Sequence, residues 1–154
     1  IDKIFKEVKL KIIVDADACP VKQIIENIAA KYDLNVIMVS NYHHQIDSNY
    51  ATVIIADGAA QAADMIIANQ TRPGDIVVTQ DYGLAAIILG RNAYAIHPRG
   101  NIYSRENIDG LLMQRYLNQK ARQANKRISG PRKKTSRDDE MFAQQFEKLI
   151  LEHK

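Results

Sequence analysis

Short apolar runs alternate with helix-like stripes along the first hundred residues. Apolar residues at helical spacing predict helices at 21–32, 59–70 and 82–90. Continuous apolar strands separated by helices are typical of a parallel sheet that helices cover on both faces. The pattern therefore predicts an α/β fold built on a parallel five-stranded sheet flanked by helices. The runs expected to form its strands lie at residues 11–14, 35–40, 51–56, 75–80 and 93–97.

The pattern changes after residue 100, where two more helices are predicted. The first spans 104–117, and the second spans 136–153, with Ser136 and Asp139 at the spacing of a capping box. We expect a single domain over residues 1–154, with a core at about 11–100 and a helical, basic C-terminal appendage at about 104–154. The apolar stripes expected to be buried are Ile108, Leu111, Leu112 and Tyr116 on the first helix and Phe142, Phe146, Leu149 and Ile150 on the second.

Composition narrows the class of protein. The 154 residues are 46% hydrophobic, which is enough for one core. No apolar run reaches the roughly 18 residues of a membrane-spanning helix. The charged first residues do not resemble a signal peptide, and a single cysteine fits a reducing compartment. We therefore expect a cytoplasmic protein with no membrane association.

Basic residues are concentrated in one segment. Residues 118–137 hold eight Lys or Arg and no Asp or Glu, whereas residues 1–117 have a net charge of −2 and the last 17 residues one of −3. A local basic block beside a mildly acidic body favours a polyanion as partner. The simpler interpretation is a solvated segment, because such runs often bind nothing in particular.

Acidic residues gather where the predicted strands end. Asp15 and Asp17 follow the first strand, Asp81 follows the fourth, and Asp64 lies on the helix after the third. Ligands of open parallel sheets bind beyond the carboxyl ends of the strands, at the switch point of the topology. If the first and fourth strands are neighbours there, these four carboxylates converge at one edge of the sheet.

Converging carboxylates repel one another and are tolerated when a cation neutralises them. A site made only of oxygen ligands suits Mg²⁺ or Mn²⁺ rather than Zn²⁺. Such an ion can activate a water molecule and hold a phosphate oxygen. Together with the basic block, the aspartates predict hydrolysis of a phosphodiester in a nucleic acid.

Simpler roles remain open for each of these acids. Asp15 or Asp17 could cap the helix that begins near Pro20, and Asp81 could cap the helix that follows it. Asp64 could be an exposed charge on its helix. The weight of the hypothesis therefore rests on the convergence of the four residues and not on any one of them.

Other reactive side chains fit structural roles better than chemical ones. Asp57 precedes a glycine and is typical of a turn, and Asp75 opens its strand, so we expect it at the opposite end of the sheet. Cys19 stands at a helix start, where a thiol pKa can fall, but a structural role is favoured. His43 and His44 are adjacent in a polar loop, and neighbouring histidines rarely share a metal.

Several motifs resemble those of a known family. The stretches "VDADACPVK", "AAD" before an apolar helix, "GDIVVTQDYGLAA", "PRG" and "GPR" are similar to the YaiI/YqxD family, which looks like a member of the PIN-like nuclease superfamily. The resemblance extends from about Lys11 to the last helix. It implies a PIN-like fold with Rossmann-type layers.

The resemblance also implies a site. It places the catalytic residues at Asp15, Asp17, Asp64, Thr79 and Asp81, with the four aspartates as metal ligands. The Thr79 hydroxyl would orient a water molecule or a carboxylate. The family often carries a further acid where this chain has Gln61. This departure leaves the metal site with one carboxylate ligand fewer.

Basic residues near the same edge are candidate phosphate contacts. Lys22 lies in the first turn of a predicted helix, and Arg99 follows the fifth strand. The expected substrate-binding residues are Lys22, Arg99, Arg132, Lys133 and Lys134. Because Tyr116 is expected to be buried, no aromatic platform is predicted, and sequence readout should be weak.

Three functions follow from these patterns. The first is a Mg²⁺- or Mn²⁺-dependent nuclease acting on RNA, in a chain whose PIN-like resemblance also allows a homodimer. The second is a catalytically silent PIN-like module that binds RNA or protein, which the Gln61 departure favours. The third is a phosphatase of the haloacid-dehalogenase kind, in which Asp15 and Asp17 would form the nucleophile motif and Ser40 the second motif.

Overall fold

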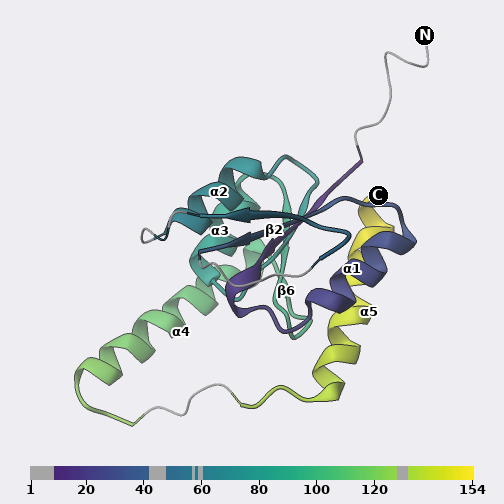
Figure 1. Cartoon of the computed structure of the whole chain (residues 1–154). Coiled ribbons are helices and arrows are strands. Elements are labelled where there is room, and N and C mark those ends of the chain that lie inside the picture. The colour runs from purple at the N-terminus through teal and green to yellow at the C-terminus, as the bar shows by residue number, and fades with distance from the viewer. Residues whose placement is uncertain (1–8, 42–47, 57, 59–60, 128–131) are drawn as a thin grey trace.

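The structure is a computed structural model that describes residues 9–41, 48–56, 58, 61–127 and 132–154. Figure 1 shows a twisted central sheet with helices on both faces, and one long helix, α4, that runs outward from the body. Both predicted features, the layered α/β core and the helical C-terminal part, are confirmed. No helix in the described part of the chain is long and apolar enough to span a membrane.

The sheet has one strand more than the sequence pattern predicts. Its described strands are β1 (Ile12–Asp15), β2 (Val36–Ser40), β3 (Thr52–Ile55), β4 (Ile76–Val78), β5 (Tyr94–Ile96) and β6 (Ile102–Tyr103). They lie in the order β3-β2-β1-β4-β5-β6, and the first five in chain order run parallel. The predicted neighbourhood of the first and fourth strands is confirmed, since Val14 pairs with Val78.

Strand β6 exists because the chain reverses sharply after β5. The amide of His97 donates to the carbonyl of Asn101 over 2.8 Å, and Gly100 has φ of +101°. A side chain is strained at that angle, and a Cβ on Gly100 would meet Met141 at 2.7 Å. The turn brings residues 102–103 back against β5 in antiparallel pairing. A two-residue strand leaves no periodic signal, so the pattern could not predict it.

Helices cover both faces of the sheet. They are α1 (Lys22–Lys31), α2 (Ala62–Gln70), α3 (Tyr82–Gly90), α4 (Arg105–Gln123) and α5 (Ser136–His153), with a short 3₁₀ turn at Ala16–Ala18. Alternate residues of β1 point to opposite faces. Ile12 and Val14 join the apolar cluster that contains α1 and α5, while Ile13 joins the cluster that contains α2 and α3. The carboxyl ends of the parallel strands therefore lie between the two helical layers.

The predicted buried stripe of α5 is confirmed, but its cap is not. The four apolar residues expected to face the core are all buried. The cap is Thr135 and not Ser136: its hydroxyl accepts from the Asp138 amide over 3.3 Å, and the Asp138 carboxylate accepts from the Thr135 amide over 3.0 Å. Thr135 has the extended backbone that a capping residue needs, so the cap lies one residue earlier than predicted and Ser136 is the first residue of the helix.

Helix α4 is longer than predicted and buries less. It continues to Gln123, into the basic segment. Ile108 is buried and Leu111 and Leu112 are half-buried, but the prediction that Tyr116 is buried is wrong, because it is 53% exposed. The helix packs on α3 near its start, and its later turns extend past that partner.

Candidate functional site

Asp15 and Thr79 meet at the carboxyl edge of the sheet. Each lies at the end of one of the paired central strands, β1 and β4. The buried Thr79 hydroxyl donates to Asp15 Oδ2 over 2.9 Å and accepts from the Asp81 amide over 3.0 Å. The Tyr103 hydroxyl in turn donates to the Thr79 carbonyl over 3.0 Å. Thr79 therefore holds two candidate acids in place at once.

Asp17 is held by the end of the neighbouring strand β2. Its carboxylate accepts from the Ser40 hydroxyl and, over 2.8 Å, from the Asn41 amide. The capping alternative for Asp15 and Asp17 is wrong, since helix α1 is capped by Val21 without any side-chain hydrogen bond. Asp17 instead spans the gap between β1 and β2.

Asp81 combines a structural and an electrostatic role. Its Oδ1 accepts from the Gly83 amide over 2.8 Å and the Leu84 amide over 3.3 Å, so the predicted alternative of a cap for α3 is confirmed. The Arg115 guanidinium from α4 lies 3.3 Å from the same oxygen. These partners fix the carboxylate at the sheet edge, where it also faces Asp64 and Asp15.

The four aspartates share one electrostatic environment. Burial raises the pKa of Asp15 to about 6, partly offset by the Thr79 hydrogen bond and reinforced by the charges of Asp64, Asp17 and Asp81. Burial and the charge of Asp81 likewise raise the pKa of Asp64, which Arg115 partly lowers. Asp64 is therefore not an isolated exposed charge. The structure brings together all four acids that the sequence places at this edge.

The donor chemistry of this cluster suits a hard divalent cation, since every side-chain ligand would be an oxygen. The geometry is looser than a finished metal site. Within the described ranges, no three His, Cys, Asp or Glu side chains are arranged so that they could hold one ion. Binding would require the carboxylates to draw closer. Gln61, where the resemblance implies an acid, caps α2 in a left-handed conformation with φ of 64°.

The five candidate phosphate contacts fall into two groups. Arg132 makes a bidentate pair with Asp138 at 2.7 and 2.9 Å, and Lys134 pairs with Asp139 at 2.8 Å. The Arg99 guanidinium donates to the Arg132 carbonyl. Two of the expected substrate residues thus hold the start of α5 in place.

Lys22 and Lys133 have no acidic partner in the part of the chain that the structure describes. Lys22 is half-buried beside the opening turn of α1, and Lys133 is exposed. Of the five cations, these two and Arg99 form no ion pair with a carboxylate in the described ranges.

Among the remaining reactive residues, Cys19 and Asp75 lie in the part of the chain that the structure describes. Cys19 is buried, and burial raises its pKa to about 11, so it stays a neutral thiol near pH 7 and is a poor nucleophile. His43, His44 and Asp57 lie outside the described residues. The expected structural role of Cys19 is thereby supported.

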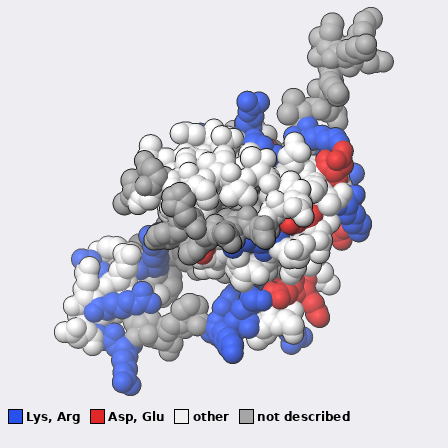
Figure 2. Space-filling view, in the orientation of Figure 1, with Lys and Arg blue, Asp and Glu red and all other residues white. Residues whose placement is uncertain are grey.

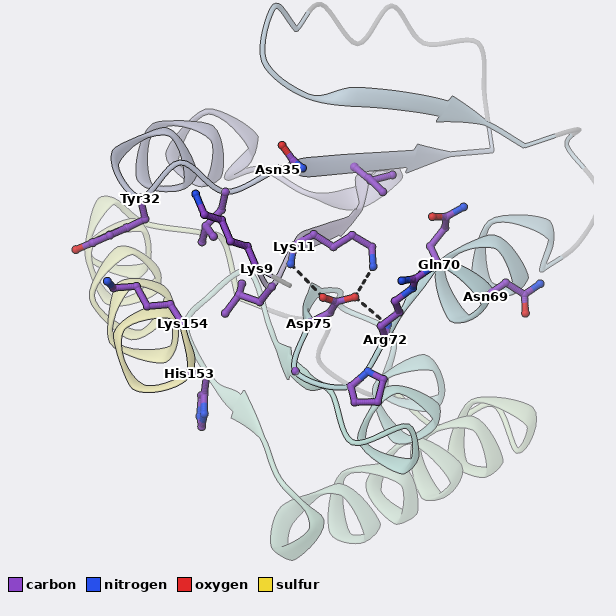
Figure 3. A pocket seen from close by; sticks show the side chains of 15 residues that line it. Lys9, Lys11, Tyr32, Asn35, Asn69, Gln70, Arg72, Asp75, His153 and Lys154 are labelled. Carbon is purple, nitrogen blue, oxygen red and sulfur yellow. Dashed lines mark hydrogen bonds and ion pairs between the residues drawn. The ribbon is translucent and has the colours of Figure 1, made fainter. Parts of the chain in front are cut away.

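Asp75 lies at the opposite end of the sheet, as predicted. It borders a hollow of about 1270 Å³ at the amino ends of the strands (Figure 3). Its carboxylate accepts from the Lys11 amide over 3.0 Å, the Lys11 ammonium over 2.5 Å and the Arg72 amide over 2.8 Å. These bonds tie β4 to the start of β1, so the buried Asp75 is a structural residue.

Arg115 is the functional candidate that the sequence did not reveal. It lies 34 positions after Asp81 and approaches the cluster only because α4 packs across α3. No motif marks it, and a single arginine on an amphipathic helix is ordinarily a solvated charge. Its helical phase gave the one usable signal, because Arg115 follows Ile108 and Leu111 on the face that packs against the body.

Comparison with known proteins agrees with the motifs. A family profile described as "Uncharacterized BCR, YaiI/YqxD family" matches residues 13–152. The UPF0178 protein of Clostridium kluyveri is 48% identical over 145 residues, which cover 94% of this chain and 95% of the relative. The UPF0178 protein of Natranaerobius thermophilus is 47% identical over 145 residues, covering 94% and 99%. No solved structure matches the chain. On the extent of these matches, the chain belongs to the YaiI/YqxD family.

Proposed function

We propose that this chain is a divalent-metal-dependent nuclease that hydrolyses phosphodiester bonds in RNA. The observation that carries the proposal is the gathering of four aspartates at the carboxyl edge of a parallel sheet, where burial and mutual repulsion raise the pKa of Asp15 to about 6. Such crowding is costly in the free protein and is relieved by a bound cation. Perturbed carboxylates of this kind cluster at functional sites.

Mg²⁺ or Mn²⁺ at Asp15, Asp17, Asp64 and Asp81 would supply the Lewis acid that polarises a phosphate oxygen and a water molecule. The chain's own part is to hold the ligands. Thr79 fixes Asp15 through its hydroxyl, and the α3 amides fix Asp81. Held carboxylates lose little further freedom when they bind, so the site is partly organised in advance.

The substrate's phosphates need cations that are not already neutralised. Lys22 and Lys133 meet that condition in the described part of the chain. Arg99 is a third candidate, since its guanidinium is bonded only to a carbonyl. Arg132 and Lys134 are weaker candidates, because a phosphate would have to displace Asp138 and Asp139.

The decisive experiment is an RNA cleavage assay with matched variants. End-labelled single-stranded and structured RNAs are incubated with purified protein and Mn²⁺ or Mg²⁺. We expect cleavage by the wild type that EDTA abolishes and that Asp15→Asn or Asp81→Asn lowers at least about a hundredfold. Asp109→Asn, an exposed aspartate early on α4, is the control and should cleave like the wild type.

Intact RNA under all these conditions would refute the nuclease. So would cleavage that Asp15→Asn leaves unchanged, since the activity would then come from a contaminant or another site. The second candidate, a silent RNA-binding module, is favoured by Gln61 and by the unfinished ligand geometry. It predicts RNA binding that does not depend on metal and is never followed by cleavage.

A further inference from the structure

The later turns of α4 form a basic projection, which we call the arm and define as residues 113–127. Figure 1 shows α4 leaving the body, and Figure 2 shows several Lys or Arg groups on this part and no acidic group on the face in view. The sequence from 110 to 127 contains no Asp or Glu. Its basic residues are Arg115, Lys120, Arg122, Lys126 and Arg127.

The cations of the arm are available to an outside partner. Lys120, Arg122, Lys126 and Arg127 are exposed, and none has a carboxylate partner among the described residues. In this they differ from Arg132 and Lys134, which acids at the start of α5 already neutralise. The unneutralised charge of the basic block thus lies mainly on the arm.

One face of α4 connects the arm to the aspartates. Arg115 reaches Asp81 at 3.3 Å, and Gln119 and Arg122 follow on the same face at spacings of four and seven residues. At the rise of an α-helix, Arg122 lies about 10 Å farther along the axis than Arg115. A chain of phosphates bound along this face would therefore lead toward the carboxyl edge of the sheet.

The adjoining face offers contacts for bases. Tyr116 is 53% exposed, and the Lys120 ammonium lies 5.6 Å from the centre of its ring. Exposed aromatic rings stack with unpaired bases whatever their sequence, and a nearby cation adds to the attraction. Met113 and Leu117 of the same helix are also exposed. This aromatic group is the platform that the sequence did not predict.

We infer that the arm is the docking surface for a single strand of nucleic acid, recognised through its phosphates and stacked bases. This inference rests on the proposed function, since it names the surface that delivers a strand to the aspartates. Charge complementarity selects the occupant: the four arm cations Lys120, Arg122, Lys126 and Arg127, which have no carboxylate partner among the described residues, match a polyphosphate and repel a second basic arm. The arm would thus bind the strand at a position outside the aspartate cluster.

The test measures strand binding in EDTA, where no metal-dependent cleavage can occur. Labelled single-stranded RNA and DNA of one sequence are titrated with wild type, Lys120→Gln/Arg122→Gln, and the matched control Lys9→Gln/Lys154→Gln at the opposite edge. Glutamine has a helix propensity close to that of lysine and arginine, and circular dichroism checks that the variants keep their helix content. We expect the arm variant to lose about tenfold in affinity at low salt and about 1.4 in the slope of log affinity against log salt, and the control to lose neither. A difference between the affinities for RNA and for DNA shows whether the protein distinguishes ribose from deoxyribose.

Three results would overturn the inference: no strand binding by the wild type, equal binding by the arm variant, or equal loss in arm and control variants. A fourth is a dimer in light scattering that Leu117→Ser dissociates while the arm variant binds strands normally, which would make α4 an interface between copies. Failure of the nuclease proposal looks different, because strand binding through the arm would persist while Mn²⁺-dependent cleavage is absent.

Discussion

The pKa of Asp15 reflects a balance among a few named neighbours. Burial is the largest influence and disfavours the charged form, Thr79 opposes it through a hydrogen bond, and three aspartates reinforce it. A carboxylate whose pKa rises on folding destabilises the fold wherever it is ionised. The chain therefore maintains an unfavourable charge at the end of its central strand, which is expected of a residue kept for binding rather than for stability.

Asp15→Asn should stabilise the protein near neutral pH. The contribution of protonated Asp15 to the free energy of unfolding is fully present below its unfolded pKa near 3.8. It is lost as pH rises through its folded pKa of about 6. Removing the charge should raise the free energy of unfolding by about 1–3 kcal/mol at pH 7.5, with a difference that shrinks toward pH 4. Urea unfolding at both pH values measures it. A variant less stable than the wild type at pH 7.5 would contradict this picture, and the exposed Asp33→Asn serves as control.

Among the elements, α5 shows how a helix start is assembled from its own sequence. Thr135 and Asp138 form a reciprocal capping box. Arg132, which precedes the helix, makes two hydrogen bonds to the Asp138 carboxylate. The Arg132 hydrogen bonds hold the pKa of Asp138 well below its usual range. This small network orders the return of the chain from the basic segment to the sheet.

Thr135→Ala should cost about 1 kcal/mol of unfolding free energy, because the Asp138 amide loses its side-chain acceptor. Ser136→Ala is the matched control one residue later, and it should change stability by much less. Thermal unfolding followed by circular dichroism compares the two. An equal loss in both, or a larger loss in Ser136→Ala, would place the cap where the sequence pattern predicted it.

On the scale of the whole molecule, the sheet lies between two apolar clusters, one on each face. Alternate side chains of each strand belong to one cluster or the other. Phe142 and Phe146 of α5 stack at 5.2 Å between ring centres and belong to the same cluster as Ile12 and Val14 of β1. The last helix is thus packed on the first strand. Loss of that packing should lower the stability of the whole fold and not only that of α5.

Phe146→Ala should lower the free energy of unfolding by about 3–5 kcal/mol, because the buried ring leaves a cavity against the sheet. Leu151→Ala, 53% exposed on the same helix, is the control and should have little effect. Since the chain has no tryptophan, far-ultraviolet and tyrosine circular dichroism are the two probes. We expect both to report one shifted transition; two separate transitions would mean that α5 unfolds independently.

The core could be predicted from the sequence because each strand is a continuous apolar run and parallel sheets follow few topologies. The placement of Asp15 near Asp81 followed from those rules, whereas Thr79 was expected there only from the family resemblance. Tyr116 was mistaken for a core residue because periodicity marks one face of a helix without saying how far its partner extends. The contact of Arg115 with Asp81 could not be predicted, since a contact across 34 residues depends on how α4 crosses α3.

The position of β1 at the centre of the sheet has a consequence for synthesis on the ribosome. The central strand leaves the exit tunnel first and can pair with β2 and then β4 as they emerge. On one face of β1 the side chains of α1 can pack early, but those of α5 join the same cluster only after residues near Ile150 have been translated. The nascent chain therefore exposes the part of this apolar cluster that α5 buries until its translation is nearly complete.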